Sequence, residues 1–130
     1  MLLDTSGLFC YHHSDEPRSA DAQTLFEAAG AKLTHDFVLA EFVALTMSRG
    51  LPRYGTLQFL SALLAHPDVE VVWVTETIYQ EAIGLLGARL DKSYSLCDAV
   101  SFVLMRQRGL HDALTTDHHF QQEGFRRLLD

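Results

Sequence analysis

The amino-acid sequence predicts a three-layer α/β/α sandwich around a central parallel sheet of four to five strands. Short apolar segments alternate with longer segments of helical pattern, which is typical of parallel strands joined by crossover helices. The apolar segments are continuous rather than alternating, which indicates that both faces of the sheet are covered. The chain has 130 residues, of which 48% are hydrophobic. This is enough for a single domain over residues 1–130.

Five segments have the length and composition of buried strands. Each is short and mainly apolar, and each is bounded by polar residues or by a helical pattern. The segments are residues 1–4, 31–35, 69–75 and 112–117, with residues 125–129 as a weaker fifth. Trp73 falls inside the third segment, and we therefore expect it in the core.

Helical patterns fill the intervals between these strands. A helix is expected directly after Asp4, and the polar stretch at residues 12–23 is interpreted as a loop that enters a second helix. The remaining helices are predicted at residues 37–50, 52–67, 75–90 and 93–109. Proline at the start of the 52–67 segment and glycine at the end of the 93–109 segment are typical helix boundaries.

Composition and charge limit the class of protein. Cys10 and Cys97 are far apart and lack metal-ligand spacing, so we expect both to be core residues in a reducing cytosol. We expect a cytoplasmic protein, because no basic leader precedes Asp4 and no apolar run nears the roughly 20 residues that span a bilayer. The net charge of −7 argues against a basic nucleic-acid-binding surface. That objection weakens if several acids surround a cation.

Asp4 and Asp117 each end a predicted strand and precede a helix. In open parallel sheets, ligands bind outside the carboxyl ends of the strands, so both acids lie at the expected functional edge. Each also fits the alternative of a helix N-cap. Asp98 has a similar alternative, because Ser95 and Asp98 have the spacing of a capping box.

Glu41 is the only charged residue between Asp36 and Arg49, inside an apolar helix. A carboxylate embedded there has a free-energy cost on the order of several kcal/mol unless it is paired or bound to a metal. No Lys or Arg lies three or four residues away to pair with it. The alternative is a glutamate at the helix edge that reaches water.

The four acids together predict a metal site at one edge of the sheet. Clustered carboxylates repel one another, and a divalent cation removes that repulsion. Oxygen ligands without an accompanying set of Cys or His favour Mg²⁺ or Mn²⁺ over Zn²⁺. The adjacent pairs His12–His13 and His118–His119 lack the spacing with which helical residues share one ion, so we expect them to be solvated.

Four short motifs along the chain resemble those of the PIN-domain family, in its VapC-like toxin type. The resemblance covers essentially the whole chain, and the order and spacing of the motifs carry it. The motifs are LLDTS with Asp4, LAEF with Glu41, SLCDAVSFVLM with Asp98, and LTTDHHFQQEGF with Thr115 and Asp117. One departure is THDFV before the second motif, where the family more often has serine at the position that we assign to the Asp36 cap.

This resemblance implies a Mg²⁺- or Mn²⁺-dependent endoribonuclease. Asp4, Asp98 and Asp117 would be the metal ligands, and Glu41 would bind a metal through water or hold the attacking water. The auxiliary residues would be Thr5, Ser6 and Thr115. Asp91 and Lys92 lie just before the third motif, where they fit either a further acid and a phosphate contact or a solvated loop, and for Lys92 we favour the loop. The implied partners are an RNA substrate, a second copy of the chain, and a small antitoxin that presents an Arg or Lys to the acids. Apolar residues in 42–50 and 56–64 would form part of the dimer surface.

Three other functions remain open at this stage. One is a stand-alone RNA-processing nuclease, and another is a catalytically inactive PIN-like binding module. A phosphoaspartyl protein with Asp4 as nucleophile is the third. It is disfavoured because Ser6 stands where a second aspartate is needed and because the last lysine is Lys92.

Overall fold

The computed structural model describes residues 1–130 and confirms the predicted α/β/α class, with five parallel strands and seven helices. The strands are β1 (Leu2–Leu3), β2 (Lys32–His35), β3 (Val69–Val72), β4 (Asp112–Leu114) and β5 (Arg126–Arg127). The helices are α1 (Thr5–His12), α2 (Ser19–Ala28), α3 (Asp36–Ser48), α4 (Arg53–Ala65), α5 (Glu76–Gly87), α6 (Leu96–Arg108) and α7 (His119–Gln122). No helix is both long enough and apolar enough to cross a membrane.

The sheet has the strand order β3-β2-β1-β4-β5, so the first strand lies at its centre. Leu2 pairs with Leu33 of β2 on one side and with Ala113 of β4 on the other. The chain adds strands on one side of β1 up to β3 and then on the other side from β4. Ligands bind at such a reversal in open sheets, here at the carboxyl ends of β1 and β4.

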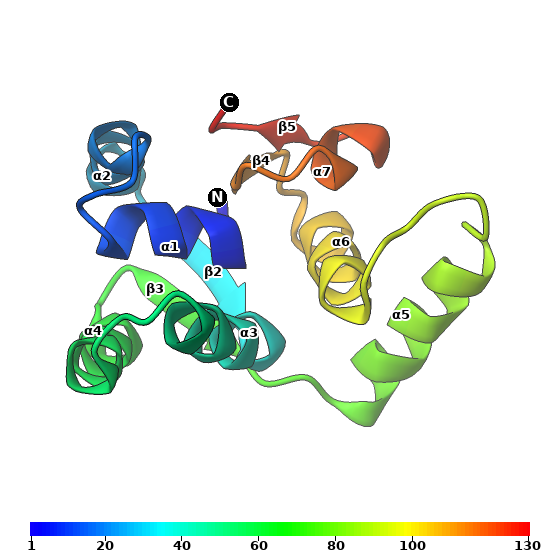
Figure 1. Cartoon of the computed structure of the whole chain (residues 1–130). Coiled ribbons are helices and arrows are strands. Elements are labelled where there is room, and N and C mark those ends of the chain that lie inside the picture. The colour runs from blue at the N-terminus through cyan, green and yellow to red at the C-terminus, as the bar shows by residue number, and fades with distance from the viewer.

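Both faces of the sheet are covered, as the continuous apolar strands predict. Successive residues of a strand point to opposite faces, so Leu3 packs with helices α1 to α4 while Leu2 packs with α5 to α7. Figure 1 shows these two groups of helices on the two sides of the sheet. The two cores have Phe42 and Phe102 among their largest fully buried side chains.

Helix α1 approaches β4 closely at Gly7. A Cβ atom at this position would lie 1.9 Å from the carbonyl oxygen of Leu114 and 2.5 Å from its carbonyl carbon. No side chain fits there without moving the backbone of one element. Glycine at position 7 therefore sets how near the start of α1 lies to the end of β4.

The N-cap of α3 is His35, not Asp36 as the sequence suggested. The ring Nδ1 of His35 accepts a hydrogen bond from the Val38 amide at 3.4 Å, and Nε2 lies 2.8 Å from the Ser101 hydroxyl of α6. Asp36 instead accepts a hydrogen bond from the Val74 amide at 2.7 Å. His35 is fully buried, and this burial lowers its pKa from 6.5 to about 4. An uncharged histidine thus connects the start of α3 to α6.

Trp73 does not lie in the core, and the prediction that it would is wrong. Strand β3 ends at Val72, one residue earlier, and the Trp73 side chain is 63% exposed. The apolar run VEVVWVT continues past the last residue that pairs with β2, so hydrophobicity alone did not mark the end of the strand.

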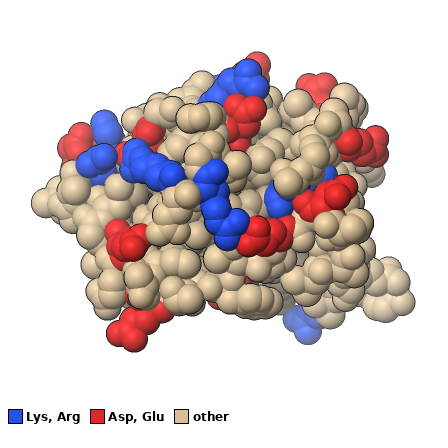
Figure 2. Space-filling view, turned by 180° about the vertical axis from the view of Figure 1, so that it is seen from behind, with Lys and Arg blue, Asp and Glu red and all other residues tan.

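The two edge strands, β3 and β5, carry charged side chains that form ion pairs. Glu70 of β3 pairs with Arg108 at 2.7 Å, and Arg126 of β5 pairs with Asp112 at 2.8 Å. Figure 2, seen from behind Figure 1, shows Lys and Arg in a band with Asp and Glu beside them. Most of the ten Lys and Arg side chains pair with carboxylates in this way.

Gly7→Ala is expected to destabilise the protein by about 3 kcal/mol or more, because overpacking here involves backbone rather than a flexible side chain. The matched control is Gly84→Ala in the exposed face of α5, where nothing lies within 4 Å of the added methyl group. That change should stabilise the protein by about 0.5–1 kcal/mol. Urea unfolding of both variants measures the difference, and equal stabilities would contradict the close approach.

The stability of the protein should fall as the pH drops from about 6.5 to about 4, through the protonation of His35. The pKa of His35 is lower in the folded state than in the unfolded chain. As the pH falls, the unfolded chain therefore binds the proton first, and this favours unfolding between about pH 6.5 and about pH 4. A variant with His35→Asn keeps a side chain suited to an N-cap but does not titrate. Relative to this variant, the wild type should lose up to about 3 kcal/mol over the range. Urea unfolding at a series of pH values tests this, and parallel curves would refute it.

Candidate active site

Asp4 lies at the carboxyl end of β1 and is 4% exposed. It occupies the N-cap position of α1, but its side chain makes no capping hydrogen bond. Its Oδ2 atom instead accepts a hydrogen bond from the Thr115 hydroxyl at 2.7 Å. The side chain of Asp4 is therefore directed to the end of β4, and the helix-cap alternative does not describe what it does.

The Thr115 hydroxyl joins the ends of β1 and β4. It gives its proton to Asp4 and receives hydrogen bonds from the Ser6 hydroxyl at 3.1 Å and the Asp117 amide at 3.0 Å. Ser6 in turn accepts a hydrogen bond from the Thr116 amide at 2.9 Å. These contacts fix the backbone after β4, so that the Asp117 amide and the Asp4 carboxylate share one hydroxyl group.

Asp98 is placed by the first turn of α6. The capping box that the sequence suggested is present, with the Asp98 amide donating to Ser95 and the Ser95 amide donating to Asp98 Oδ2, both at 3.0 Å. Asp98 is nevertheless only 7% exposed, and the same Oδ2 atom lies 3.1 Å from Nδ1 of His119. The capping role and a place in the acid cluster are therefore compatible.

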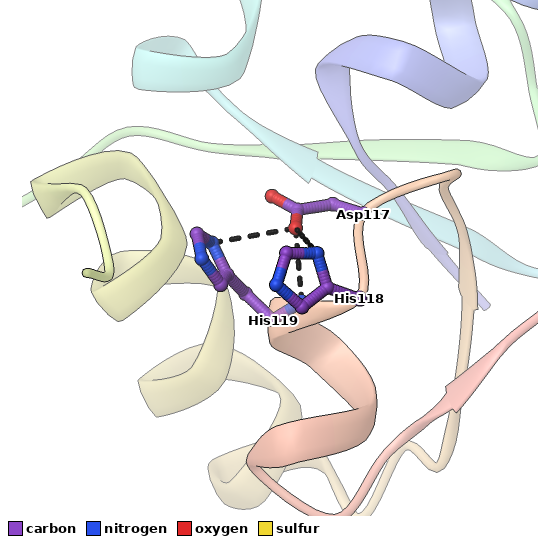
Figure 3. Close-up of side chains that lie close together, drawn as sticks. All are labelled: Asp117, His118 and His119. Atoms are coloured by element: carbon purple, nitrogen blue, oxygen red, sulfur yellow. Dashed lines mark hydrogen bonds and ion pairs between the residues drawn. The ribbon is translucent and has the colours of Figure 1, made fainter. Parts of the chain in front are cut away.

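His119 connects Asp98 to Asp117, and sequence reasoning missed it. Its Nδ1 atom lies 3.3 Å from Asp117 Oδ1, which also accepts a hydrogen bond from the His119 amide at 2.9 Å (Figure 3). The His119 side chain is 15% exposed and that of His118 is 64% exposed. The prediction of a solvated pair thus holds for His118 and is wrong for His119.

Glu41 reaches the cluster from α3 but is solvent-exposed, so the expectation of an embedded carboxylate is wrong. The helix is apolar along its sequence, yet Ala40, Glu41 and Ala44 form its outer face. The Glu41 carboxylate still faces the site. Its charge contributes to the raised pKa of Asp4 and, after burial, is the main cause of the raised pKa of the Cys97 thiol.

The remaining predicted residues lie in different places. Thr5 follows Asp4 in α1, and its hydroxyl oxygen is buried without a hydrogen-bond partner. Asp91 is exposed and pairs with Lys92 at 3.2 Å, and no contact brings either residue to the acids. Cys10 and Cys97 are free and buried, as expected.

The ionised forms of two acids in the cluster are disfavoured, because the pKa values of Asp4 and Asp98 are raised. Burial is the main cause that raises the pKa of Asp4 from 3.8 to about 7. The Thr115 hydrogen bond opposes this rise, and the charge of Asp98 adds to it. Burial also raises the pKa of Asp98, with the charge of Asp117 adding to it. No Lys or Arg forms an ion pair with any of the four acids.

These residues fit a divalent cation. Each of the three aspartates uses one carboxylate oxygen for the hydrogen bonds described above, and its other oxygen remains for a ligand. Oxygen-rich sites of this kind suit Mg²⁺ or Mn²⁺. A cation would also supply the positive charge that the surrounding side chains do not.

Two cavities lie away from the acids. One, about 660 Å³, is lined by residues that include Met1, Lys32 and Arg108 at the amino-terminal edge of the sheet. The other is lined by residues of α5, and neither contains any of the four acids.

Comparisons with known proteins agree with this arrangement. The family model of the PIN domain matches residues 1–125. No curated protein matches the chain. Among solved structures, VapC20 of Mycobacterium tuberculosis, a toxin that cleaves the sarcin–ricin loop, is similar with a TM-score of 0.89 and 26% sequence identity. The match covers 99% of this chain and 98% of the VapC20 chain. The chain therefore belongs to the PIN domain family, and it is of the VapC-like type.

Proposed function

We propose that the protein is a Mg²⁺- or Mn²⁺-dependent endoribonuclease that acts as the toxin of a toxin–antitoxin pair. Its family and its likeness to VapC20 support a toxin-type nuclease. The observation that carries the metal dependence is the cluster of Asp4, Asp98 and Asp117. Each is held by protein hydrogen bonds through one oxygen, and none is paired with Lys or Arg.

In this proposal each residue has a distinct role. Asp4, Asp98 and Asp117 hold the cation, and the Thr115 hydroxyl fixes the orientation of Asp4. Glu41, exposed on the solvent side, holds the attacking water. When bound, a divalent cation would supply Lewis-acid chemistry that lowers the pKa of this water and offsets charge on the phosphate. Glu41 would take a proton from the water as the water oxygen bonds to phosphorus, the bond from phosphorus to the leaving oxygen would break, and that oxygen would take up a proton from solvent.

An RNA stem-loop is the proposed substrate class. The sarcin–ricin loop is the target named for VapC20, and an oligonucleotide with that loop is therefore the first probe for this chain. Six of the ten Lys and Arg side chains are engaged in ion pairs. The cation rather than a basic surface would thus provide most of the charge that meets the phosphate.

A homodimer and a small antitoxin complete the proposal. Three apolar side chains of the predicted surface, Met47, Leu57 and Leu64, are exposed, which supports a partner on α3 and α4. Trp73, Tyr79 and Ile83 are also exposed apolar side chains, outside the surface that the sequence analysis predicted. The antitoxin would place an Arg or Lys at the acids, which lack such a partner within the chain.

Asp4→Asn should reduce metal-dependent RNA cleavage at least about 100-fold, because the carboxylate that binds the cation becomes a neutral amide. Without metal at pH 8, the same change should raise the free energy of unfolding by about 1–3 kcal/mol. The reason is that Asp4 has a raised pKa in the fold and its ionised form opposes folding above that pKa. The asparagine oxygen can still accept the Thr115 hydrogen bond.

The matched control is Asp112→Asn, the same change at the other edge of the sheet, where Asp112 pairs with Arg126. It should leave cleavage unchanged. Cleavage is measured on the stem-loop with Mg²⁺, with Mn²⁺ and with EDTA, and stability by thermal unfolding. A wild type that cleaves equally in EDTA would refute the metal dependence. A large loss of stability in Asp4→Asn would show that the residue mainly serves the fold.

The wild type should be a dimer at micromolar concentration, and Leu57→Glu should shift it to monomer, since a charge would then be buried in the interface. Leu90→Glu is the control, because Leu90 is more exposed but lies outside the predicted surface. Light scattering measures the mass of each. A monomeric wild type would refute the dimer. A Leu57→Glu variant that remains a dimer would show that the interface lies elsewhere.

A further inference from the structure

The imidazole ring of His119 stands between two of the candidate metal ligands. Its Nδ1 atom lies 3.1 Å from Asp98 Oδ2. The same atom lies 3.3 Å from Asp117 Oδ1, as Figure 3 shows. The two aspartates come from separate elements, the first turn of α6 and the segment after β4. His119 is therefore a single group that contacts both acids.

The contacts of the ring determine which nitrogen carries the proton. Both groups that face Nδ1 are carboxylates, which accept hydrogen bonds, so Nδ1 carries a hydrogen. The Nε2 atom lies 3.1 Å from the Ser93 hydroxyl and can accept its hydrogen bond. In this tautomer the Nδ1 lone pair is not available to a metal ion. His119 thus acts on the two acids as a donor.

Tyr94 also contacts the His119 ring in this orientation. Tyr94 packs edge-on against it with a centroid distance of 5.3 Å. The Tyr94 hydroxyl donates to Glu123 at 3.2 Å, and Glu123 also pairs with Arg89 and Arg106. These contacts attach the segment before α6 to the end of α7, and they hold Tyr94 in place beside the ring.

The hydrogen bonds also decide which carboxylate oxygens face a ligand. Asp98 Oδ2 receives both the Ser95 amide and the His119 ring, and Asp117 Oδ1 receives the amide and ring of His119. The other carboxylate oxygens, Oδ1 of Asp98 and Oδ2 of Asp117, accept none of these hydrogen bonds. We propose that His119 is a positioning residue that holds Asp98 and Asp117 with these two oxygens directed to a shared divalent cation. This inference rests on the metal-dependent function proposed above.

The competing reading makes His119 a ligand itself. Ligand atoms of Asp117, His118 and His119 all lie within 4.8 Å of one another, close enough to surround one ion. This reading requires Nδ1 to lose its hydrogen and leave Asp98, and it requires the exposed His118 ring to be fixed. The existing contacts with both carboxylates favour the donor role.

The test is the affinity for Mn²⁺, measured by calorimetry on the RNA-free protein. His119→Ala should weaken binding by about 10- to 100-fold, the usual effect of removing a residue that orients metal ligands. His119→Asn should recover much of this loss, because its amide nitrogen can donate from nearly the position of Nδ1. His118→Ala is the control and should bind as the wild type does, since the exposed ring lies 3.8 Å from Asp117. Circular dichroism at the same temperature verifies that each variant is folded.

Each other outcome counts against a stated part of the inference. Equal Mn²⁺ affinity in His119→Ala and the wild type would overturn the positioning role and leave the nuclease proposal intact. Direct ¹⁴N coordination in pulsed electron paramagnetic resonance of the Mn²⁺ complex, or loss of binding in His118→Ala, would overturn it in favour of the histidine ligands. A wild type that binds no Mn²⁺ would overturn both proposals. If His119→Ala is unfolded, the His119→Asn variant decides, and an Mn²⁺ affinity far below that of the wild type would refute the donor role.

Discussion

The candidate site depends on how closely α1 approaches β4, and glycine at position 7 permits that approach. The central strand β1 has only two residues, and the chain turns directly from it into α1. Because α1 lies against the Leu114 carbonyl, Asp4 and Ser6 come within hydrogen-bond distance of the Thr115 hydroxyl. A bulkier residue at this position would separate the ends of the two strands. The packing of one helix on one strand thus determines the geometry of the acids.

A continuous polar network runs from Asp4 at the start of α1 to Asp98 in α6. Asp4 is joined to Thr115, Thr115 to Asp117, and Asp117 through His119 to Asp98. The network orients the carboxylates but does not neutralise them, since none is paired with Lys or Arg. Like charges in a buried site reduce folding stability, and proteins tolerate this where function requires it. Burial raises the pKa of Asp4, and the charges of Asp98 and Glu41 add to this rise.

The sequence predicted the fold class and the position of the acids because both follow from strand and helix order. Asp4 and Asp117 end apolar runs, and parallel strands bring such ends to one edge of a sheet. Details that depend on tertiary contacts were not predictable. The run that contains Trp73 gave no sign of where pairing with β2 stops. Glu41 lies on the outer face of a helix whose composition is apolar on nearly every side.

Two histidines show a different limit of sequence reasoning. Spacing rules treat His118 and His119 as a pair that would have to share one ion, whereas the turn after Asp117 directs only His119 inward. At His35, preference scales favour Asp36 as the helix cap, yet the ring nitrogen caps α3 and the other nitrogen reaches Ser101. Each assignment depends on a residue distant in sequence, Asp98 for His119 and Ser101 for His35.

The edges of the sheet restrict how other chains can attach. A partner that adds a strand needs a long edge with free backbone groups and few charges. Strand β5 offers two residues, both arginine, and β3 has its glutamate engaged with Arg108. Neither edge favours strand addition, whereas several helices present apolar side chains. The edges of the sheet therefore disfavour partners that would add a strand, and the same edges oppose growth of the sheet into larger β-aggregates.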